Sequence, residues 1–130
     1  MKKIGIVQLI LATAVTTALG ATPGWTPDAA TISKLESNIK PGDIPKFSDG
    51  HLPIVTEYDR YYAPYMAADH RMIRGELVIP IGSKMKPAGV YVVDSEKDFP
   101  HISDGGCAIV HVVYDVETAR VVSLKCNGYA

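Results

Sequence analysis

Hydrophobic and polar positions divide the chain into three stretches with different patterns. The first is an uncharged, mainly apolar run from Ile4 to Leu19. The second, over residues 26–40, carries apolar residues at spacings of three and four, which is typical of one face of a helix. From residue 54 onward, short runs rich in β-branched and aromatic residues alternate with polar or glycine-containing segments, which favours strands. The pattern predicts a leader, one helix and then a sheet.

The first stretch has the layout of a secretory signal peptide. Lys2 and Lys3 form a charged n-region, residues 4–19 form the apolar h-region, and the small residues up to Gly20 fit a signal-peptidase site. The apolar run is also shorter than the about 20 residues that cross a bilayer. We expect cleavage near Gly20 or Ala21, which leaves residues 21–130 as a single small domain. That domain would be periplasmic or secreted and would have no membrane anchor.

One helix is predicted at the start of this domain. Thr26 is a good N-cap and Pro27 suits the first helical position, while Asp28 places a carboxylate at the positive end of the helix dipole. The apolar stripe that follows consists of Ile32, Leu35 and Ile39. The segment 40–42, Lys-Pro-Gly, supplies the stop, so the helix should make three to four turns.

About five strands are expected after an irregular connection over residues 41–53. The runs that predict them are 54–62, 72–81, 90–93, 107–114 and 120–126. Residues 67–70 would turn the chain between the first two strands, and residues 81–87 would form a loop. One helix followed by consecutive strands implies an α+β domain, in which the N-terminal helix packs on an antiparallel sheet.

The two cysteines, Cys107 and Cys126, are predicted to form a disulfide that links the closing hairpin. An even pair of cysteines in an exported protein favours a disulfide, and the alternative of a reactive thiol lacks a Cys-x-x-Cys motif. Residues 115–119 have turn character, and parity puts both cysteines on one face in either register that the turn allows. One register places them opposite each other and the other places them diagonally. Closing a loop of about 20 residues would stabilise the fold by about 3 kcal/mol in the chain-entropy model.

Charge narrows the possible functions once the leader is set aside. The whole chain has a formal net charge of −1, and removal of the two leader lysines leaves −3. A small acidic domain excludes a multidomain enzyme, a large cofactor-binding fold and a basic nucleic-acid binder. We therefore expect no nucleic acid among its partners.

Tyrosines cluster in the first predicted strand. On a strand, Tyr58 and Tyr62 would face one way and Tyr61 and Tyr65 the other, and Pro64 argues against a helix here. Tyrosine combines an apolar ring with a polar tip, so rings beside arginines can stack on sugars or grip a peptide. The alternative is that these tyrosines only pack on a half-buried sheet. The candidate binding residues are Tyr58, Arg60, Tyr61, Tyr65, Arg71 and Arg74.

The polar segment 94–104 offers a different kind of chemistry. It places Asp98, His101 and Asp104 at spacings of three, with Ser103 beside them. The segment does not fit a calcium loop, since Phe99 stands where the sharp-turn glycine belongs. Nor does it have a nucleophile turn or an oxyanion-hole motif. We expect no cofactor and no metal, and we assign no catalytic residue.

The C-terminal end resembles small exported bacterial proteins, through Asp104-Gly105-Gly106-Cys107 and the closing Cys126-Asn127-Gly128. It is also similar to periplasmic peptidase inhibitors that end in a hairpin closing on cysteine and glycine. That similarity covers about the last 20 residues and includes no reactive-loop motif. It implies an inhibitor-like role without identifying a residue.

Two functional hypotheses follow. The first is a non-enzymatic, exported binding module with a protein, peptide or glycan partner in the periplasm. The second is a small periplasmic hydrolase or metal-dependent enzyme that uses the 94–104 loop. Exposed, contiguous Tyr61, Tyr65 and Arg71 would favour the module. A pocket that joins His101 and Asp104 to His51 or His70 would favour the enzyme.

Overall fold

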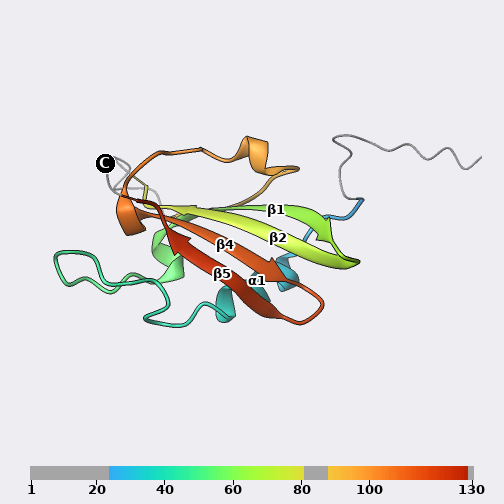
Figure 1. Cartoon of the computed structure of the whole chain (residues 1–130), viewed down its shortest axis with the longest axis horizontal. Coiled ribbons are helices and arrows are strands. Elements are labelled where there is room, and N and C mark those ends of the chain that lie inside the picture. Colours follow the sequence, from blue (N-terminus) through green and yellow to red (C-terminus); the bar gives the residue numbers. More distant parts are fainter. Residues whose placement is uncertain (1–23, 81–87, 129–130) are drawn as a thin grey trace, which may run out of the picture.

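One helix and five strands make up the fold in the computed structural model, which describes residues 24–80 and 88–128. The elements are α1 (Ala29–Ser37), β1 (Asp59–Ala67), β2 (His70–Val78), β3 (Val90–Val92), β4 (Ile109–Asp115) and β5 (Arg120–Cys126). The α+β class is confirmed, with α1 on one face of the sheet (Figure 1). The predicted leader and the predicted loop over 81–87 lie outside the described residues. None of the described helices is long and apolar enough to cross a membrane.

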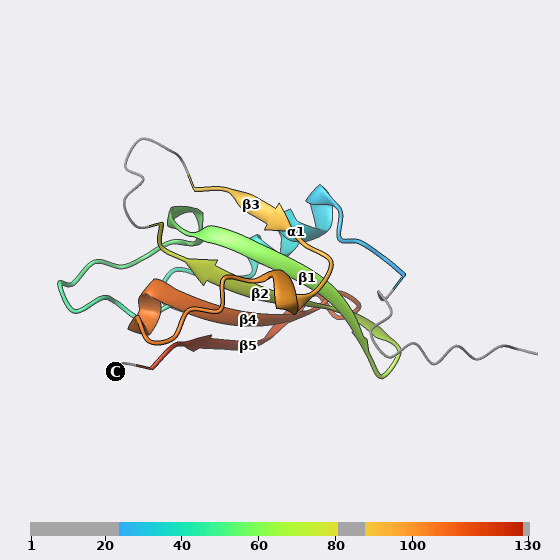
Figure 2. The ribbon, with the colours of Figure 1, turned by 90° about the horizontal axis from the view of Figure 1, so that it is seen from above.

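The sheet is mixed, with the strand order β3-β1-β2-β4-β5. The pairings β1–β2, β2–β4 and β4–β5 are antiparallel, as predicted. The pairing of β3 with β1 is parallel, which was not predicted. The chain direction alternates from β1 to β2 to β3, and β3 lies beyond β1, so these two strands run the same way. The connection from β3 to β4 therefore crosses over the sheet on the face opposite α1, as Figures 1 and 2 show. We call the two faces the helix face and the crossover face.

The helix begins later than predicted because Asp28, not Thr26, is its N-cap. The Asp28 carboxylate accepts hydrogen bonds from both the backbone N–H and the hydroxyl of Thr31, at 2.8 and 2.7 Å. The helix ends at Ser37 with Asn38 as its C-cap, before the predicted stop. Two of the three residues in the predicted stripe are fully buried, and Ile39 packs against the core from beyond the helix.

The first strand extends past Pro64, which the sequence pattern placed after its end. Residues 55–57 form a short 3-10 turn instead, and β1 begins at Asp59. A proline lacks the N–H that a central strand needs, but β3 pairs with β1 only at residues 60–62. Pro64 therefore lies where one side of β1 has no neighbouring strand, and it is accommodated there.

The core lies between α1 and the helix face of the sheet. Its fully buried cluster contains Ile32, Leu35, Ile44, Tyr58, Tyr62, Ile73, Leu77, Val110, Val112 and Tyr114. Three tyrosines in this cluster contribute large apolar rings, and two of them bury their hydroxyl groups next to acceptors. Tyr58 Oη donates to the Cys107 carbonyl at 2.6 Å, and Tyr62 Oη donates to Glu36 Oε2 at 2.7 Å. Burial raises the pKa of Tyr58 to about 12.

The position of the Tyr62 ring leaves no room for a side chain at Gly75. A Cβ at Gly75 would lie 2.8 Å from Cε1 of Tyr62, which is directly opposite on β1. Gly75→Ala should therefore lower the free energy of unfolding by about 1–3 kcal/mol, because the buried Tyr62 ring or the backbone would have to shift to admit the methyl group. Urea denaturation measures the loss. Gly128→Ala is the control, since nothing lies within 4 Å of a Cβ there, and equal stabilities for the two variants would contradict this account.

The predicted disulfide joins Cys107 and Cys126 and is confirmed. Their Cα atoms are 4.6 Å apart. Cys126 is the last residue of β5, whereas Cys107 lies in the 3-10 turn Gly106–Ala108 just before β4. The disulfide therefore ties the end of the last strand to the end of the crossover connection.

At the turn of the closing hairpin Asp115 pairs with Arg120, which is the predicted register that by itself would place the two cysteines diagonally. A bulge then shifts the pairing, because Tyr114 lies opposite Val121 and Val113 lies opposite Ser123. Val122 is the extra residue, and it is 60% exposed at the edge of the sheet. The bulge keeps apolar side chains of β5 directed to the helix face on both sides of Val122.

Candidate functional site

The predicted tyrosines separate onto the two faces of β1. Tyr58 and Tyr62 point into the core and have no exposed surface, while Tyr61 and Tyr65 lie half-buried on the crossover face. The period of two along a strand explains this separation. Of these four tyrosines, only Tyr61 and Tyr65 can present their rings to a partner.

Two pairs of side chains on the crossover face, which we together call the aromatic face, are Tyr61 with Tyr91 and Tyr65 with Arg74. The rings of Tyr61 and Tyr91 stack across β1 and β3, with centroids 4.9 Å apart and planes inclined by 18°. The Arg74 guanidinium lies 4.5 Å from the centre of the Tyr65 ring. Stacked rings and a cation over a ring are favourable arrangements that also keep these side chains in fixed positions.

Tyr91 was not among the predicted binding residues. Its strand was expected from the sequence, but its place beside Tyr61 depends on the parallel pairing of β3 with β1. A pairing between segments 30 residues apart leaves no local periodic signal. Burial of Tyr61 raises the pKa of its hydroxyl, with a smaller contribution from the nearby Asp59 carboxylate. At neutral pH Tyr61 therefore offers a hydroxyl that can donate a hydrogen bond.

Arg60, a predicted binding residue, is buried on the helix face. Its Nε lies 2.9 Å from Glu36 Oε2, and the side chains of Arg60 and Glu36 are only 9% and 16% exposed. The same carboxylate oxygen accepts the hydrogen bond from Tyr62. Arg60 thus joins α1 to β1 and does not reach the aromatic face.

Arg71, another predicted binding residue, also points away from the aromatic face. Its Nε donates to Glu117 Oε2 at 2.8 Å, and its backbone N–H donates to the same oxygen at 3.0 Å. Its guanidinium lies 5.7 Å from the centre of the Trp25 ring. The contact with Arg71 lowers the pKa of Glu117 to about 2. Arg71 therefore links the two hairpin turns, and Arg74 is the arginine that accompanies the exposed tyrosines.

The crossover segment is tied to the sheet by hydrogen bonds. The backbone N–H of His101 donates to the buried carboxylate of Glu76 at 3.1 Å. Asn127 Nδ2 donates to the carbonyls of Ile102 and Asp104 at 2.7 and 2.8 Å. Phe99, which belongs to the segment, is buried. These contacts hold the crossover segment against the sheet.

The histidine rings form hydrogen bonds with different groups. His51 contacts Glu57 and His70 contacts Asp115, each at 2.7 Å, while His111 Nε2 lies 2.6 Å from Asn127 Oδ1. The hydrogen bond to Asp115 raises the pKa of His70. Within residues 24–80 and 88–128, no three His, Cys, Asp or Glu side chains are arranged to hold a metal ion. Among the described residues, no hydrogen bond or ion pair joins His101 or Asp104 to His51 or His70.

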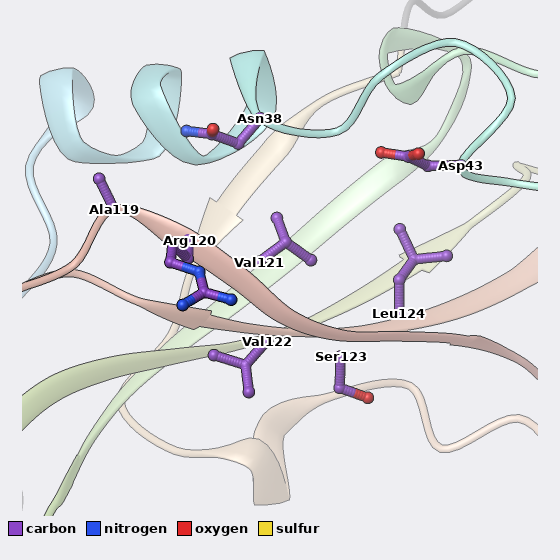
Figure 3. Close-up of a pocket in the computed structure, with 8 residues that line it drawn as sticks. All are labelled: Asn38, Asp43, Ala119, Arg120, Val121, Val122, Ser123 and Leu124. Carbon is purple, nitrogen blue, oxygen red and sulfur yellow. The ribbon is translucent and has the colours of Figure 1, made fainter.

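A groove lies between the C-terminal end of α1 and the edge strand β5 (Figure 3). Its volume is about 420 Å³. Asn38 and Asp43 form its helix-side rim, and residues 119–124 form the other wall. Val121 and Leu124 point toward the helix side, whereas Ser123 points away (Figure 3). The sequence pattern identified β5 as a strand but gave no sign that it would be an edge strand beside a helix.

No protein-family model, curated protein or solved structure matches this chain. Two surfaces of the described residues can therefore be compared on geometry alone. The aromatic face presents stacked rings on one side of the sheet. The groove combines the apolar side chains of Val121 and Leu124 with polar groups on its rim, beside the edge strand β5.

Proposed function

We propose that the protein is an exported, non-enzymatic binding module whose aromatic face contacts a protein, peptide or glycan partner. The observation that carries this proposal is the Tyr61–Tyr91 stack, with the Tyr65–Arg74 pair on the same face of the sheet. Large rings that are already held in place lose little conformational entropy on binding, and tyrosine and arginine are enriched among residues that dominate binding energy. The disulfide supports export, since disulfides persist in oxidising compartments.

The aromatic face has polar groups at its border, as a specific binding surface requires. Arg74 Nε lies 3.4 Å from Glu96 Oε2, and both side chains are well exposed. An exposed ion pair of this kind contributes little to stability. Arg74 or Glu96 can therefore leave the pair and bind a ligand group at little cost. An apolar centre with a polar rim is the usual organisation of protein interfaces.

Replacement of the exposed rings tests the proposal. Tyr61→Ala and Tyr65→Ala should each lower recovery of the specific partner by about tenfold or more, because each removes a ring from the centre of the surface. The melting temperature should change by no more than about 8 °C, since neither ring belongs to the buried core. The measurement is affinity capture from a periplasmic extract on the immobilised oxidised protein, with quantification of bound protein and glycan.

Two controls make the outcome specific. Tyr61→Phe keeps the ring and should keep most of the binding, whereas Met66→Ala removes an exposed apolar side chain (47% exposed) outside the aromatic face and should change nothing. Loss of stability with unchanged capture would show that the tyrosines serve only for packing. In that case the aromatic face would not be the binding surface.

A further inference from the structure

We propose that the open edge of β5, with the groove beside it, binds an extended peptide of alternating acidic and apolar residues as an additional antiparallel strand. This site is separate from the aromatic face and does not depend on the function proposed above. Three features of β5 carry the proposal: its unpaired backbone, its apolar side chains in the groove and its unpaired cations.

The outer side of β5 has no neighbouring strand among the described residues, because β5 ends the sheet order. The strand has seven residues, which corresponds to a length of about 24 Å. Asn127 N donates to Ile109 O at 3.0 Å, so alternate residues going back from Asn127 share the ladder with β4. The alternation directs the N–H and C=O of Leu124 toward the open edge. An incoming strand can therefore form backbone hydrogen bonds there.

The groove seats side chains on one side of such a strand. Val121 and Leu124 project into it, with Asn38 on the opposite rim (Figure 3). Its volume of about 420 Å³ falls within the usual range for binding pockets, roughly 300–1,000 Å³. In β-augmentation, the backbone supplies affinity and a groove beside the edge strand selects alternate side chains. Apolar residues of the peptide would occupy this side.

Cations lie on the other side of β5. Arg120 pairs with Asp115 in the ladder, and Lys125 pairs with His111, which places both on the crossover face. No carboxylate occurs in β5 itself. Residues that neighbour one another across strands interact, so acidic side chains of an added strand would meet these two cations.

Arg120 also differs from the other arginines of the chain. Three of the four make ion pairs, with Glu36, Glu96 and Glu117, and all three pairs lie elsewhere. Neither Arg120 nor Lys125 forms an ion pair with any described side chain. Asp43, on the groove rim, already accepts a hydrogen bond from Lys40 N at 2.7 Å. Acidic side chains of the peptide would be repelled by Asp43 on the groove side and attracted by Arg120 and Lys125 on the crossover face.

The same charges disfavour a second copy of the chain as the occupant. Two β5 edges brought together would carry only positive side chains, and cations on an edge strand are a known means of preventing such self-pairing. An acidic peptide has the opposite charge and gains from it. The bulge at Val122 keeps Arg120 and Lys125 on one face although they are five residues apart. A strand that passes the bulge as β4 does would meet them at positions four apart, which fits strict alternation of acidic and apolar residues.

The direct test uses a labelled peptide with the sequence Glu-Val-Glu-Val-Glu-Val, blocked at both ends, and the oxidised protein at low salt. We expect saturable binding by fluorescence anisotropy, together with slower hydrogen exchange at the Leu124 amide in NMR spectra. The comparison peptides are Glu-Glu-Glu-Val-Val-Val, with the same composition but no alternation, and Lys-Val-Lys-Val-Lys-Val. Both should bind at least about fivefold more weakly. Equal binding of all three peptides, or no binding of the first, would overturn the proposal.

Charge variants locate the site on β5. The double variant Arg120→Glu, Lys125→Glu should weaken binding of the alternating acidic peptide by at least about fivefold. Lys46→Glu, Lys97→Glu is the matched control, with the same change in net charge at two exposed lysines outside β5. Equal losses in the two variants would show attraction to net charge alone and overturn the site. Protection of Leu124 that depends on protein concentration without peptide would identify a second copy as the occupant and also overturn it.

Tyr61→Ala separates this inference from the proposed function. It should leave binding of the alternating peptide unchanged, because Tyr61 is on β1 and faces away from the groove. A loss of peptide binding in this variant would assign the peptide to the aromatic face and overturn the β5 site. Loss of partner capture with intact peptide binding would support two separate surfaces.

Discussion

Glu36→Ala should destabilise the protein by about 3–5 kcal/mol, the largest loss that we expect from a single substitution. The change leaves the Arg60 guanidinium buried without its carboxylate, and it removes the acceptor of the Tyr62 hydroxyl. Both groups lie at the contact between α1 and β1, where water cannot easily replace the lost oxygen atoms. Since domains of this size are stable by about 5–15 kcal/mol, the loss is a large share of the total. Urea denaturation measures it.

An exposed ion pair provides the control. Glu96→Ala removes the partner of Arg74, but these side chains are 59% and 45% exposed. Its cost should stay below about 1 kcal/mol. Replacing both members of the buried pair, as in Glu36→Leu with Arg60→Met, should recover much of the loss, because no charge is then left unpaired. Similar costs for Glu36→Ala and Glu96→Ala would show that burial of the first pair has no energetic consequence.

Loss of the disulfide should be the next largest effect, at about 3 kcal/mol. Cys107 and Cys126 are 19 residues apart in sequence. Opening a loop of this size increases the conformational entropy of the unfolded chain, which lowers the free energy of unfolding by about 3 kcal/mol. The native contacts at this end also depend on Cys107, whose carbonyl accepts the hydrogen bond from Tyr58. The measurement is the difference in free energy of unfolding between the oxidised and reduced protein in urea.

The double variant Cys107→Ser, Cys126→Ser distinguishes the crosslink from effects of the reductant. It should match the reduced protein in stability and should not respond to reductant. If reduction leaves the unfolding midpoint of the natural sequence unchanged, the disulfide does not stabilise the fold.

Local periodicity predicted much of the fold because it depends on neighbouring residues. The alternation along the first strand predicted that Tyr58 and Tyr62 face one way and Tyr61 and Tyr65 the other. The structure shows that the first pair faces the core, although Tyr58 was predicted to be a binding residue. The helix was predicted from its apolar stripe, although its start was misplaced because Thr26 and Asp28 are both good caps and only the structure shows which one reaches Thr31.

The features that the sequence did not predict depend on distant pairings. The parallel position of β3 brings Tyr91 beside Tyr61, and nothing near either residue indicates it. Arg60 shares the helix face of the sheet with Tyr58 and Tyr62, and an arginine on a strand is usually exposed. It is buried here because its guanidinium pairs with Glu36 on α1, a contact that the local sequence does not indicate. The groove likewise requires both the edge position of β5 and the place where α1 ends.

The short edge strand β3 is the strand that should open most easily. The four strands β1, β2, β4 and β5 form a continuous antiparallel set, whereas β3 adds only three residues at one edge and exposes Val90 and Val92. Short edge elements with few buried contacts open at a lower free-energy cost than the whole domain. Release of β3 would separate Tyr91 from Tyr61 and uncover the Tyr61 ring while the core stays folded. A partner that binds the stacked Tyr61–Tyr91 pair would bind only the closed form, so its binding would hold β3 in the sheet and make this local opening rarer.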